Sequence, residues 1–421
     1  MEKILRFVEK FIPKQVYKFF QPLYHIFLAI LGMIIYRMPS RHIYVIGVTG
    51  TKGKSSTVEF INAVLEASGK KTAILSTIRF KIGDQTRPNK YKMTMPGRLF
   101  TQKFLRRAVN SHCEYAIIEM TSEAARFFRH LGIHMDALIF TNLSPEHIES
   151  HGSFAKYKEA KLRLVKQLAR SDKPARLSIA NIDNEHGVSF LVYPVERNIG
   201  YSLKNVKILS ETQVSSIIEY RGTRILIPLP GKFNISNALA SLTLASELDI
   251  PLDTAKKGIE SLSIIRGRVE KVDMGQDFTV IVDYAHTDDS LRKLYEAFSN
   301  SRKIAVLGST GGGRDSWKRP VLGKIADEHC DEIIVTNEDP YDENPMKIIT
   351  EVASGVSKHK AHIIVDRREA ISYSFSLARA GDVILITGKG TDPYIMGPNN
   401  TKTEWDDATV VREELKKYLE R

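Results

Sequence analysis

The chain has 421 residues, a length that suggests about three units of 100–200 residues each. Hydrophobic residues make up 43% and charged residues 26% of the chain, the balance of an ordinary soluble globular protein. The two cysteines, Cys113 and Cys330, have no CxxC spacing, which argues against a disulfide framework or a zinc ribbon and fits a reducing, cytoplasmic compartment. The formal net charge is +12, but no concentrated basic face with aromatic residues occurs beyond the N-terminus, so no nucleic-acid partner is expected.

Residues 1–42 form a basic and apolar N-terminal segment with seven Lys or Arg and two Glu, a net charge of +5. Its apolar residues recur at helical spacing, Pro13 interrupts the pattern, and Pro22 precedes the uncharged run 23–36. That run would span about 21 Å as a helix, which is too short for a hydrocarbon core of about 30 Å, and no signal-peptide cleavage site follows it. Two interpretations stay open: a helical segment lying on the inner face of a membrane, or helices that pack against the protein itself or another subunit.

A glycine-rich turn follows an apolar, β-branched run over residues 43–48 and precedes a helical pattern that ends at Gly69. In such a strand–turn–helix unit the backbone N–H groups at the helix start face an anion, Lys54 adds a point charge, and the Ser55 hydroxyl can hold Mg²⁺. The strict G-x-x-x-x-G-K-S/T expression is not met, because its first glycine position holds Val48. We nevertheless predict a nucleotide-phosphate site, formed by Gly50, Thr51, Lys52, Gly53, Lys54, Ser55 and Ser56.

Strands alternate with helical runs through the rest of the chain. The first series of expected strands covers residues 72–77, 115–119, 137–142, 176–181 and 224–228. The second series covers residues 279–283, 303–308, 332–336, 362–366 and 382–387. Helical runs such as 100–109 and 154–168 lie between them. This alternation predicts an α/β fold with a mostly parallel sheet, followed by a separate doubly wound domain.

Two further polar groups follow strands of the first series. Glu119 ends an apolar strand, where a Mg²⁺ ligand belongs in a P-loop domain, although a solvated carboxylate that begins a helix is an equal interpretation. His147 and His151 are four residues apart, but the glutamate of H-E-x-x-H is absent and no third ligand is evident, so zinc is the weaker interpretation. Lys161 has the pattern of an ordinary helix-surface lysine.

Later motifs are weak when taken singly. Asn234 and Asn237 lie three residues apart at an expected helix start, where they either cap the helix or bond to a base. Near the start of the second domain, Arg268 supplies a cation and the 283–286 run supplies an acid and a histidine. The turn at 311–320 combines glycines with cations and suits a carboxylate or phosphate.

The order of these motifs, from the 48–56 turn to the 311–320 turn, resembles the Mur ligases, and most closely their MurE type, the UDP-N-acetylmuramoyl-tripeptide synthetases. The resemblance covers residue 43 to the C-terminus and implies an ATP-dependent amide-bond ligase of peptidoglycan precursor synthesis. It implies a central P-loop ATPase domain over 43–265 and a C-terminal Rossmann-like domain over 266–421, after the segment 1–42. Folylpolyglutamate synthases share the architecture but generally lack the Asp-Tyr-Ala-His and Gly-Arg-Asp signatures present here.

The resemblance also implies roles for individual residues. Lys54, Lys161 and His147 would be catalytic, and Ser55, Glu119, His147 and a carbamylated Lys161 would hold two Mg²⁺ ions. ATP would further contact Asn234, Asn237, Arg268, Asp283 and His286. The UDP-MurNAc-peptide and the amino acid would contact Thr94, Ser122, Arg129, Arg314, Lys318, Asp339, Pro340, Tyr341, Gly388 and Asp392. A substrate carboxylate would attack the γ-phosphate of ATP, and an amine would then displace phosphate from the acyl phosphate.

Three departures from the MurE pattern bear on the substrates. The usual uridine-binding first domain is replaced by the short segment 1–42, which makes a membrane-proximal or lipid-linked acceptor conceivable. The Asp-Asn-Pro-Arg motif of diaminopimelate enzymes reads Glu338-Asp339-Pro340-Tyr341, and Gly-Lys-Gly-His-Glu ends here in Thr391-Asp392. The added amino acid therefore stays open among diaminopimelate, lysine and other amines. A related ligase with another acyl acceptor and a catalytically silent nucleotide-binding scaffold are the alternatives.

Overall fold

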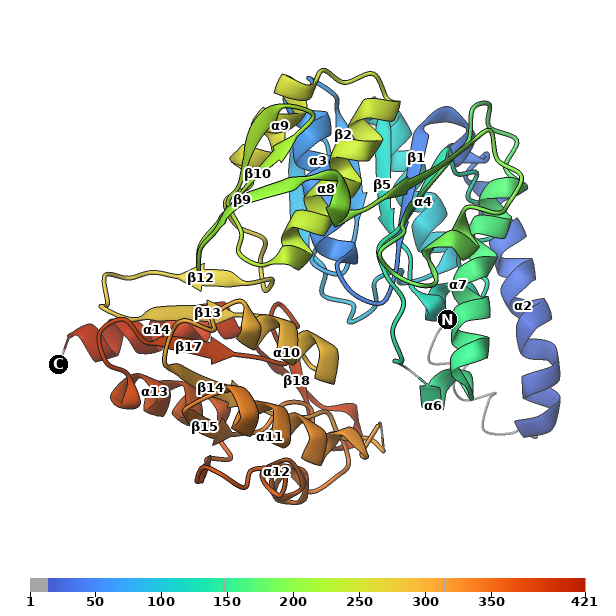
Figure 1. Ribbon diagram of the computed structural model, residues 1–421. Helices are drawn as coiled ribbons and strands as arrows, with labels where there is room; N and C mark the ends of the chain where they lie inside the picture. Colours follow the sequence, from blue (N-terminus) through green and yellow to red (C-terminus); the bar gives the residue numbers. More distant parts are fainter. Residues whose placement is uncertain (1–13, 147, 314, 421) are drawn as a thin grey trace. The chain divides into compact units, whose positions relative to one another are not determined.

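The computed structural model describes residues 14–146, 148–313 and 315–420, and the chain divides into two compact units (Figure 1). The N-terminal unit comprises Met1–Ser144, Phe154–Tyr201 and Thr243–Leu248. The C-terminal unit comprises Pro145–Ser153, Ser202–Leu242 and Asp249–Arg421. The C-terminal unit thus includes residues 202–242, which the sequence analysis assigned to the central domain 43–265. The domain boundary at residue 265 stays a prediction.

The N-terminal unit is built on an eight-stranded sheet in the order β4-β3-β2-β5-β1-β6-β7-β8. All neighbouring strands are parallel except the pairs β2–β3 and β3–β4, so the predicted mostly parallel sheet is confirmed. The strands are β1 (Tyr44–Thr49), β2 (Thr72–Leu75), β3 (Arg79–Ile82), β4 (Gln85–Pro88), β5 (Tyr115–Glu119), β6 (Ala137–Phe140), β7 (Leu177–Asn181) and β8 (Arg197–Tyr201).

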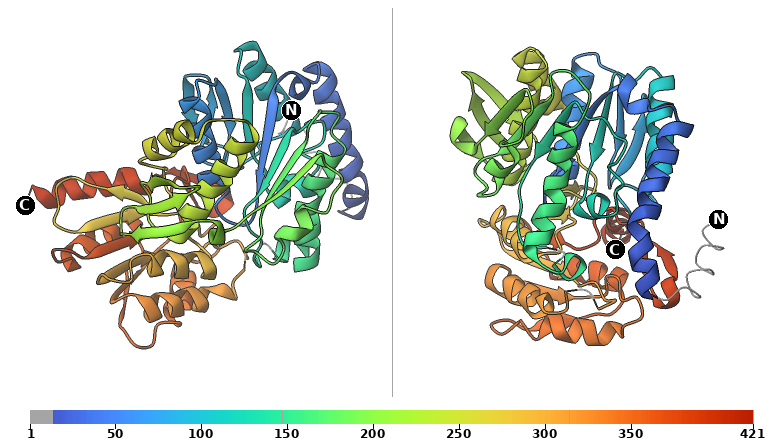
Figure 2. Two further views of the ribbon diagram at one scale, coloured as in Figure 1. Left: turned by 45° about the horizontal axis from the view of Figure 1, so that its top comes forward. Right: turned by 90° about the vertical axis from the view of Figure 1, so that its right-hand side faces the viewer.

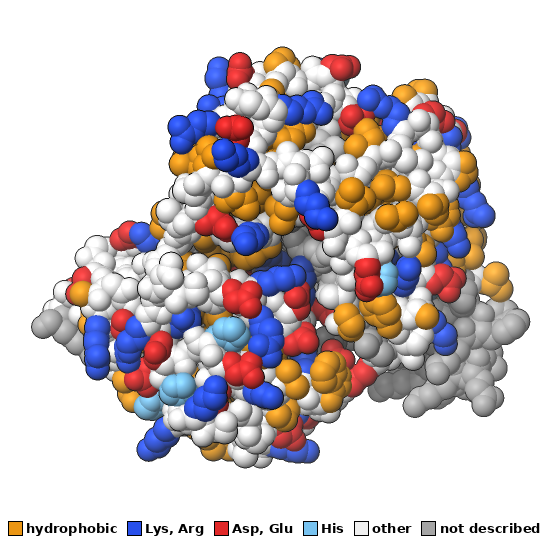
Figure 3. All heavy atoms as spheres, viewed as in Figure 1, with side chains coloured by type: hydrophobic (Ala, Val, Ile, Leu, Met, Phe, Trp, Pro, Cys, Tyr) orange, Lys and Arg blue, Asp and Glu red, His pale blue; other side chains and the backbone are white. Residues whose placement is uncertain are grey.

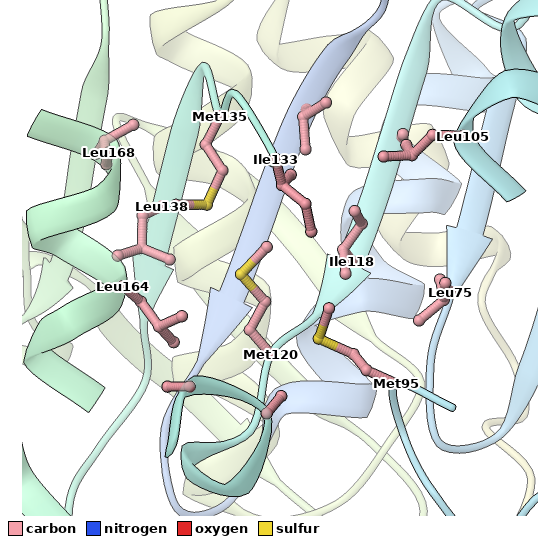
Figure 4. Close-up of a cluster of buried hydrophobic side chains, with 14 of the residues drawn as sticks. Leu75, Met95, Leu105, Ile118, Met120, Ile133, Met135, Leu138, Leu164 and Leu168 are labelled. Carbon is pink, nitrogen blue, oxygen red and sulfur yellow. The ribbon is translucent and has the colours of Figure 1, made fainter. Parts of the chain in front are cut away.

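Helices cover this sheet because each carries an apolar side that is buried against the strands. They are α3 (Lys54–Ala67), α4 (Arg98–Asn110), α5 (Ser122–Arg126) and α7 (Phe154–Ala169), with short helices at η1 (Pro39–His42) and η2 (Gly187–Phe190). Figure 4 shows the core between sheet and helices, where Leu105 of α4 and Leu164 of α7 point toward strand residues such as Ile118 and Leu138. This packing aligns the carboxyl ends of β1, β5 and β6 at one edge of the sheet.

The helix α2 (Lys14–Ile35) begins directly after Pro13 and contains the uncharged run that follows Pro22. One side of α2 packs on α4, with Ala29 and Gly32 buried, which agrees with the interpretation that this segment packs against the protein itself (Figure 2). The apolar pattern expected before Pro13 lies outside the described residues. Within the part of the chain that is described, no helix is long and apolar enough to cross a membrane.

The C-terminal unit contains a second sheet in the order β12-β13-β17-β14-β15-β16, parallel except for the pair β12–β13. Its strands are β12 (Glu270–Val272), β13 (Thr279–Val282), β14 (Lys303–Leu307), β15 (Glu332–Val335), β16 (Ala361–Ile363) and β17 (Val383–Ile386). The expected strand 362–366 was therefore placed too far along the chain. The helices on this sheet are α10 (Asp288–Glu296), α11 (Lys318–His329), α12 (Pro345–Ala353), α13 (Arg367–Leu377) and α14 (Asp407–Leu419).

Smaller elements complete the C-terminal unit. The strand expected at 224–228 does not join a parallel sheet, because β11 (Thr223–Ile227) pairs antiparallel with β10 (Ser216–Tyr220), which pairs with β9 (Lys207–Glu211). The remaining elements are α6 (Ile148–His151), η3 (Leu203–Asn205), α8 (Lys232–Glu247, which continues into the N-terminal unit), α9 (Leu252–Ser261), β18 (Tyr394–Met396), η4 (Pro398–Asn400) and β19 (Lys402–Glu404). On the face seen in Figure 3, Lys and Arg side chains are interspersed with Asp and Glu.

Candidate functional site

The glycine-rich turn joins β1 to α3 and is held closely against the end of β6. The Thr51 N–H donates to the carbonyl of Asn142 at 2.8 Å, and the Lys52 N–H donates to the Asn142 side-chain oxygen at 2.9 Å. A Cβ atom on Gly50 would lie 1.9 Å from Thr141 Oγ1, so this position has room for glycine alone. Gly53 (φ 79°) adopts the left-handed conformation directly before α3, where few other residues are tolerated. The turn thus has the compact backbone that a phosphate cradle requires.

The side chains of the turn lie at the start of α3. Lys54 Nζ donates to the carbonyl of Thr51 at 2.8 Å, so its ammonium group is held over the loop. Ser55 and Ser56 are buried within the first turn of the helix, where the backbone N–H groups carry the positive end of the helix dipole. This arrangement suits the phosphates of a nucleotide.

A carboxylate meets the turn from the neighbouring strand. Ser55 Oγ donates to Glu119 Oε2 at 2.9 Å, and the Thr77 N–H donates to the same oxygen at 2.8 Å. The hydroxyl of Thr77 lies 2.8 Å from that of Thr94. The structure therefore brings Ser55, Glu119 and Thr94 together at the ends of β1, β2 and β5. Glu119 is 2% exposed, so the alternative of a solvated carboxylate is wrong.

Lys161 is buried in α7 and is not the helix-surface lysine that its sequence pattern suggests. Its side chain is 1% exposed, and Nζ donates to the carbonyl of Gly50 at 2.6 Å. The ammonium group also lies 4.9 Å from the centre of the Tyr157 ring, whose hydroxyl is 3.0 Å from Thr51 Oγ1. Lys161 and Tyr157 thus contact the turn from the side opposite its helix.

The side chains beside the turn form a donor set that fits a metal ion. Ser55 and Glu119 together offer a hydroxyl and a carboxylate oxygen beside the phosphate turn, the hard donors that Mg²⁺ prefers. Over residues 14–146, 148–313 and 315–420, no cluster of three or more His, Cys, Asp or Glu side chains could hold a metal by itself. The pair therefore fits Mg²⁺ that keeps waters and phosphate oxygens as its other ligands. The predicted ligand His147 lies outside the described residues.

Two of the predicted acceptor residues border this site. Arg129 Nη1 donates to the carbonyl of Met95 at 2.8 Å, and Met95 is the residue that follows Thr94. Ser122 is the first residue of α5 and lies three residues after Glu119, the last residue of β5. It is 2% exposed. Both residues thus belong to the same edge of the sheet as Glu119.

In the C-terminal unit, Asn234 and Asn237 contact one another inside α8. Asn237 Nδ2 donates to Asn234 Oδ1 at 3.4 Å, and Asn234 Nδ2 donates to the carbonyl of Pro230 at 2.8 Å. Because α8 begins at Lys232, neither asparagine is at its N-cap, and the capping interpretation is wrong. A contact to a base stays a prediction.

Arg268, Asp283 and His286 surround Tyr284. The guanidinium of Arg268 lies 4.6 Å from the centre of the Tyr284 ring, and His286 Nδ1 is 2.7 Å from the Tyr284 carbonyl. The Asp283 carboxylate accepts the N–H groups of Val269 and Ala285, both at 2.7 Å. Burial raises the pKa of Tyr284 well above its ordinary value, so the phenol stays protonated. These contacts give the three predicted residues fixed positions beside one buried aromatic ring.

The residues predicted for the amino acid gather around Lys389, to which the sequence had assigned no role. Lys389 is 1% exposed and donates to Asp339 at 2.9 Å, to Asp392 at 3.0 Å and to the Tyr394 carbonyl at 2.6 Å. A Cβ on Gly388 would lie 2.4 Å from Glu338 Oε2. The loops that follow β15 and β17 are therefore joined by one buried ion-pair network.

The remaining members of this set lie on the adjoining turn. The Gly311 N–H donates to the carbonyl of Asp339 at 2.7 Å, and the Pro340 carbonyl would meet a Cβ on Gly311. The Tyr341 ring borders Gly312, and Lys318 begins α11 with Nζ 3.8 Å from Asp315. Arg314 lies outside the described residues.

Several contacting residues were not predicted as site residues. Thr77, Asn142, Tyr157 and Lys389 each contact a predicted residue, although none of the four was assigned a role. Two of them had a usable signal: Asn142 directly follows an apolar strand and precedes a turn, and Lys389 lies in the Gly-Lys-Gly stretch that resembles a family motif.

Comparison with known proteins agrees with this geometry. Residues 48–245 match the Mur ligase middle domain, and residues 267–390 match the Mur ligase glutamate ligase domain. The UDP-N-acetylmuramoyl-L-alanyl-D-glutamate–2,6-diaminopimelate ligase of Bacillus licheniformis is 35% identical over 401 residues, which cover 91% of this chain and 81% of the relative. The UDP-N-acetylmuramyl-tripeptide synthetase of a Roseiflexus species is 36% identical over 416 residues, with coverages of 92% and 81%.

Solved structures give the same result. A UDP-N-acetylmuramoyl-L-alanyl-D-glutamate–2,6-diaminopimelate ligase matches with a TM-score of 0.60 at 26% identity, over 90% of this chain and 79% of the other. The folylpolyglutamate synthase of Mycobacterium tuberculosis, complexed with ADP and AMPPCP, matches in fold with a TM-score of 0.70 at 15% identity, over 94% and 95% of the two chains. From its two matched domains and its similarity to these relatives over nine-tenths of its length, the chain belongs to the Mur ligase family.

Proposed function

We propose that this protein is an ATP-dependent ligase that joins the amine of an amino acid to the peptide carboxylate of UDP-MurNAc-L-Ala-D-Glu, in the cytoplasm. The observation that carries the proposal is the contact of Ser55 with Glu119 beside the phosphate turn. The printed activities of the relatives, a diaminopimelate ligase and a tripeptide synthetase, supply the substrate class. A nucleotide-binding scaffold would have no use for a buried carboxylate at this position.

The turn and the neighbouring Glu119 supply the groups that handle ATP in the proposed reaction. Lys54 and the N–H groups at the start of α3 bind the phosphates of ATP, and Ser55 and Glu119 hold Mg²⁺, which offsets charge on the transferring phosphoryl group. The acceptor carboxylate attacks the γ-phosphorus, which gives an acyl phosphate and ADP. The incoming amine then attacks the acyl carbon, the amide bond forms and phosphate leaves with the carboxylate oxygen.

Lys161 has a separate proposed role. Its ammonium group loses one proton, and the neutral amine adds to carbon dioxide and loses a second proton. The product is a carbamate anion that would be able to support a second Mg²⁺. The burial of Lys161 against the Gly50 carbonyl supports this proposal, because a carbamate formed there would lie beside the phosphates. Asn234, Asn237, Arg268, Asp283 and His286 are proposed to contact the nucleotide from the C-terminal unit.

The test is release of phosphate from ATP in the presence of UDP-MurNAc-L-Ala-D-Glu and each of a panel of amino acids. We expect release that depends on both the acceptor and one amine, with a product whose mass equals the acceptor plus that amino acid less water. Diaminopimelate and lysine are the first members of the panel. Absence of acceptor-dependent release across the panel, with ATP still bound, would contradict the proposal.

We also propose that the segment 1–42 contacts the surface of an anionic membrane. The outward side of α2 exposes Leu23, Phe27, Ile30 and Ile34, which recur at helical spacing and are 49–63% exposed. The segment carries a net charge of +5, which complements anionic headgroups.

Sedimentation with vesicles tests this contact. We expect the protein to pellet with phosphatidylglycerol vesicles and not with phosphatidylcholine vesicles, and Phe27→Glu with Ile34→Glu to abolish pelleting. Val192→Glu is the matched control, since Val192 is equally apolar and exposed elsewhere on the N-terminal unit. Pelleting that the double variant leaves unchanged would remove α2 from the contact.

A further inference from the structure

Two cationic side chains and one histidine, from separate segments of the N-terminal unit, meet around Phe127. His25 of α2 contacts the Phe127 ring edge-on, with ring centres 5.7 Å apart. The guanidinium of Arg129 lies 5.8 Å from the same ring, and Arg98, the first residue of α4, donates to the carbonyl of Phe127. We call these three residues the cation cluster.

The cation cluster is unusual because its members have buried nitrogens that lack partners. Both ring nitrogens of His25 and the Nε atoms of Arg98 and Arg129 are buried without a hydrogen-bond partner within the described residues. No ion pair with a carboxylate is recorded for any of the three in that part of the chain. Buried donors are costly unless they are satisfied, so such a cluster calls for an acceptor from outside the chain.

Burial, and to a lesser extent mutual repulsion, lowers pKa values within the cluster. Burial, together with the charges of Arg98 and Arg129, lowers the pKa of His25 to about 4. Burial and the charge of Arg129 lower the pKa of Arg98 to about 10. An anion placed among the three would relieve this repulsion, whereas a neutral or cationic ligand would not.

The cluster is connected to the phosphate site through a short series of contacts. Arg129 donates to the carbonyl of Met95, and the preceding Thr94 touches Thr77, which donates to Glu119. Figure 4 shows Met95 beside Met120, immediately beyond the end of β5. A ligand that occupies the cluster therefore extends along the same sheet edge as the proposed site of phosphoryl transfer.

We propose that His25, Arg98 and Arg129 bind a non-reacting oxyanion of the acyl acceptor, either a phosphate or a second carboxylate. This inference rests on the proposed ligase function. A contact of Arg129 with the acceptor is implied by the family resemblance, while Arg98 and His25 are additions that come from this structure. Since His25 belongs to α2, the N-terminal helix takes part in holding the acceptor.

The test compares Michaelis constants for UDP-MurNAc-L-Ala-D-Glu. Arg98→Gln and His25→Phe are each expected to raise this constant about tenfold, because each removes a hydrogen-bond donor to the oxyanion. The kcat and the Michaelis constant for ATP are expected to stay within about twofold. Arg107→Gln is the matched control, because Arg107 is an exposed cation on the same helix. Arg98→Lys keeps the charge and should recover most of the affinity.

A second acceptor separates the two sources of the oxyanion. With MurNAc-L-Ala-D-Glu, which lacks the nucleotide diphosphate, the effect of Arg98→Gln disappears if the cluster binds phosphate and persists if it binds a carboxylate. The inference is overturned if Arg98→Gln and His25→Phe, with unchanged melting temperatures, behave as Arg107→Gln does toward both acceptors.

Binding without turnover keeps the inference testable if no ligase activity is found. Calorimetric titration with pyrophosphate or with L-Ala-D-Glu, in saturating Mg-ADP, should then show binding that Arg98→Gln weakens and Arg107→Gln does not. Binding with no ligation would reject the proposed function and retain the anion site. Equal binding by both variants would reject the anion site alone.

Discussion

The hydroxyl of Ser55 donates a 2.9 Å hydrogen bond to Oε2 of Glu119, and this bond links the first turn of α3 to the end of β5. The two residues are 64 positions apart, and the sheet brings them together because β1 and β5 are adjacent parallel strands. In a parallel sheet such strands end at the same edge, where ligands bind. A hydroxyl and a carboxylate are thereby prepared beside a phosphate-binding turn.

Replacing Glu119 tests this relationship. Glu119→Gln should lower the ligation rate by at least about 100-fold, because the neutral amide cannot balance the charge of Mg²⁺ near the phosphates. Initial rates over a range of Mg²⁺ concentrations measure the effect, and the concentration needed for half-maximal rate should rise. Glu114→Gln is the control, since Glu114 is a half-exposed carboxylate that immediately precedes the same strand and pairs with Lys70. An unchanged Mg²⁺ dependence in Glu119→Gln would show that Glu119 does not hold the ion.

Lys161→Ala should abolish ligation, since it removes the buried amine 2.6 Å from the Gly50 carbonyl. A small carboxylic acid such as acetate should restore part of the rate, because it supplies the anion that a carbamate would otherwise provide. Lys166→Ala, an exposed change on the same helix, should be silent in the same assay. Full activity of Lys161→Ala would exclude the metal-supporting role.

We expect Tyr341 to influence which amino acid is added in the proposed reaction, since the family resemblance places it at the amino-acid site. It stands where diaminopimelate enzymes have an arginine that meets the distal carboxylate, so Tyr341→Arg should raise the preference for diaminopimelate over lysine about tenfold. The ratio of kcat/KM values for the two amines measures this preference. Tyr341→Phe keeps the ring beside Gly312 and should leave the ratio unchanged. A ratio that Tyr341→Arg also leaves unchanged would place the side chain of the amino acid elsewhere.

The ion pair of Arg367 with Asp407 should be important for the stability of the C-terminal unit. Both side chains are 0% exposed, with two hydrogen bonds of 2.8 and 2.7 Å between them. Arg367→Met leaves a buried carboxylate without its cation and should lower the free energy of unfolding by about 3–5 kcal/mol.

Urea unfolding followed by the fluorescence of Trp405, whose indole donates to Asp407, measures this change. The neighbouring Arg368 is 39% exposed and pairs with Glu413 and Glu414, so Arg368→Met should cost at most about 1 kcal/mol. Equal losses in the two variants would contradict the assigned difference between a buried and a surface ion pair.

The sequence predicted best those elements that have a continuous apolar run. The strands around 115–119 and 303–308 are buried on both faces, so their Val and Ile runs could be recognised without tertiary information. The edge strand β4 and its neighbour β3, with sequences Gln-Thr-Arg-Pro and Arg-Phe-Lys-Ile, have no such run and were missed. Their strand conformation depends on the pairing of β3 with β2 and of β4 with β3, which no local pattern reveals.

The site was predictable to the extent that its residues fall in ordered motifs. Lys54 and Ser55 follow from one local pattern, whereas His25, Arg98 and Arg129 are dozens of residues apart and meet only after α2 packs on α4. Likewise, the burial of Lys161 could not be inferred from a helix whose other lysines face solvent. Contacts of this kind are set by tertiary packing and have no spacing in the sequence.

The close packing of α2 has a practical consequence for anyone who trims this chain to its recognisable domains. The Gly132 position leaves room for Met33, and Arg106 donates to the carbonyls of Tyr36 and Arg37. A version cloned from the β1 strand onward would lose these partners and uncover the apolar side of α4. Such a truncation would remove a packed helix from the N-terminal unit. Residues 1–42 should therefore be kept when the protein is expressed.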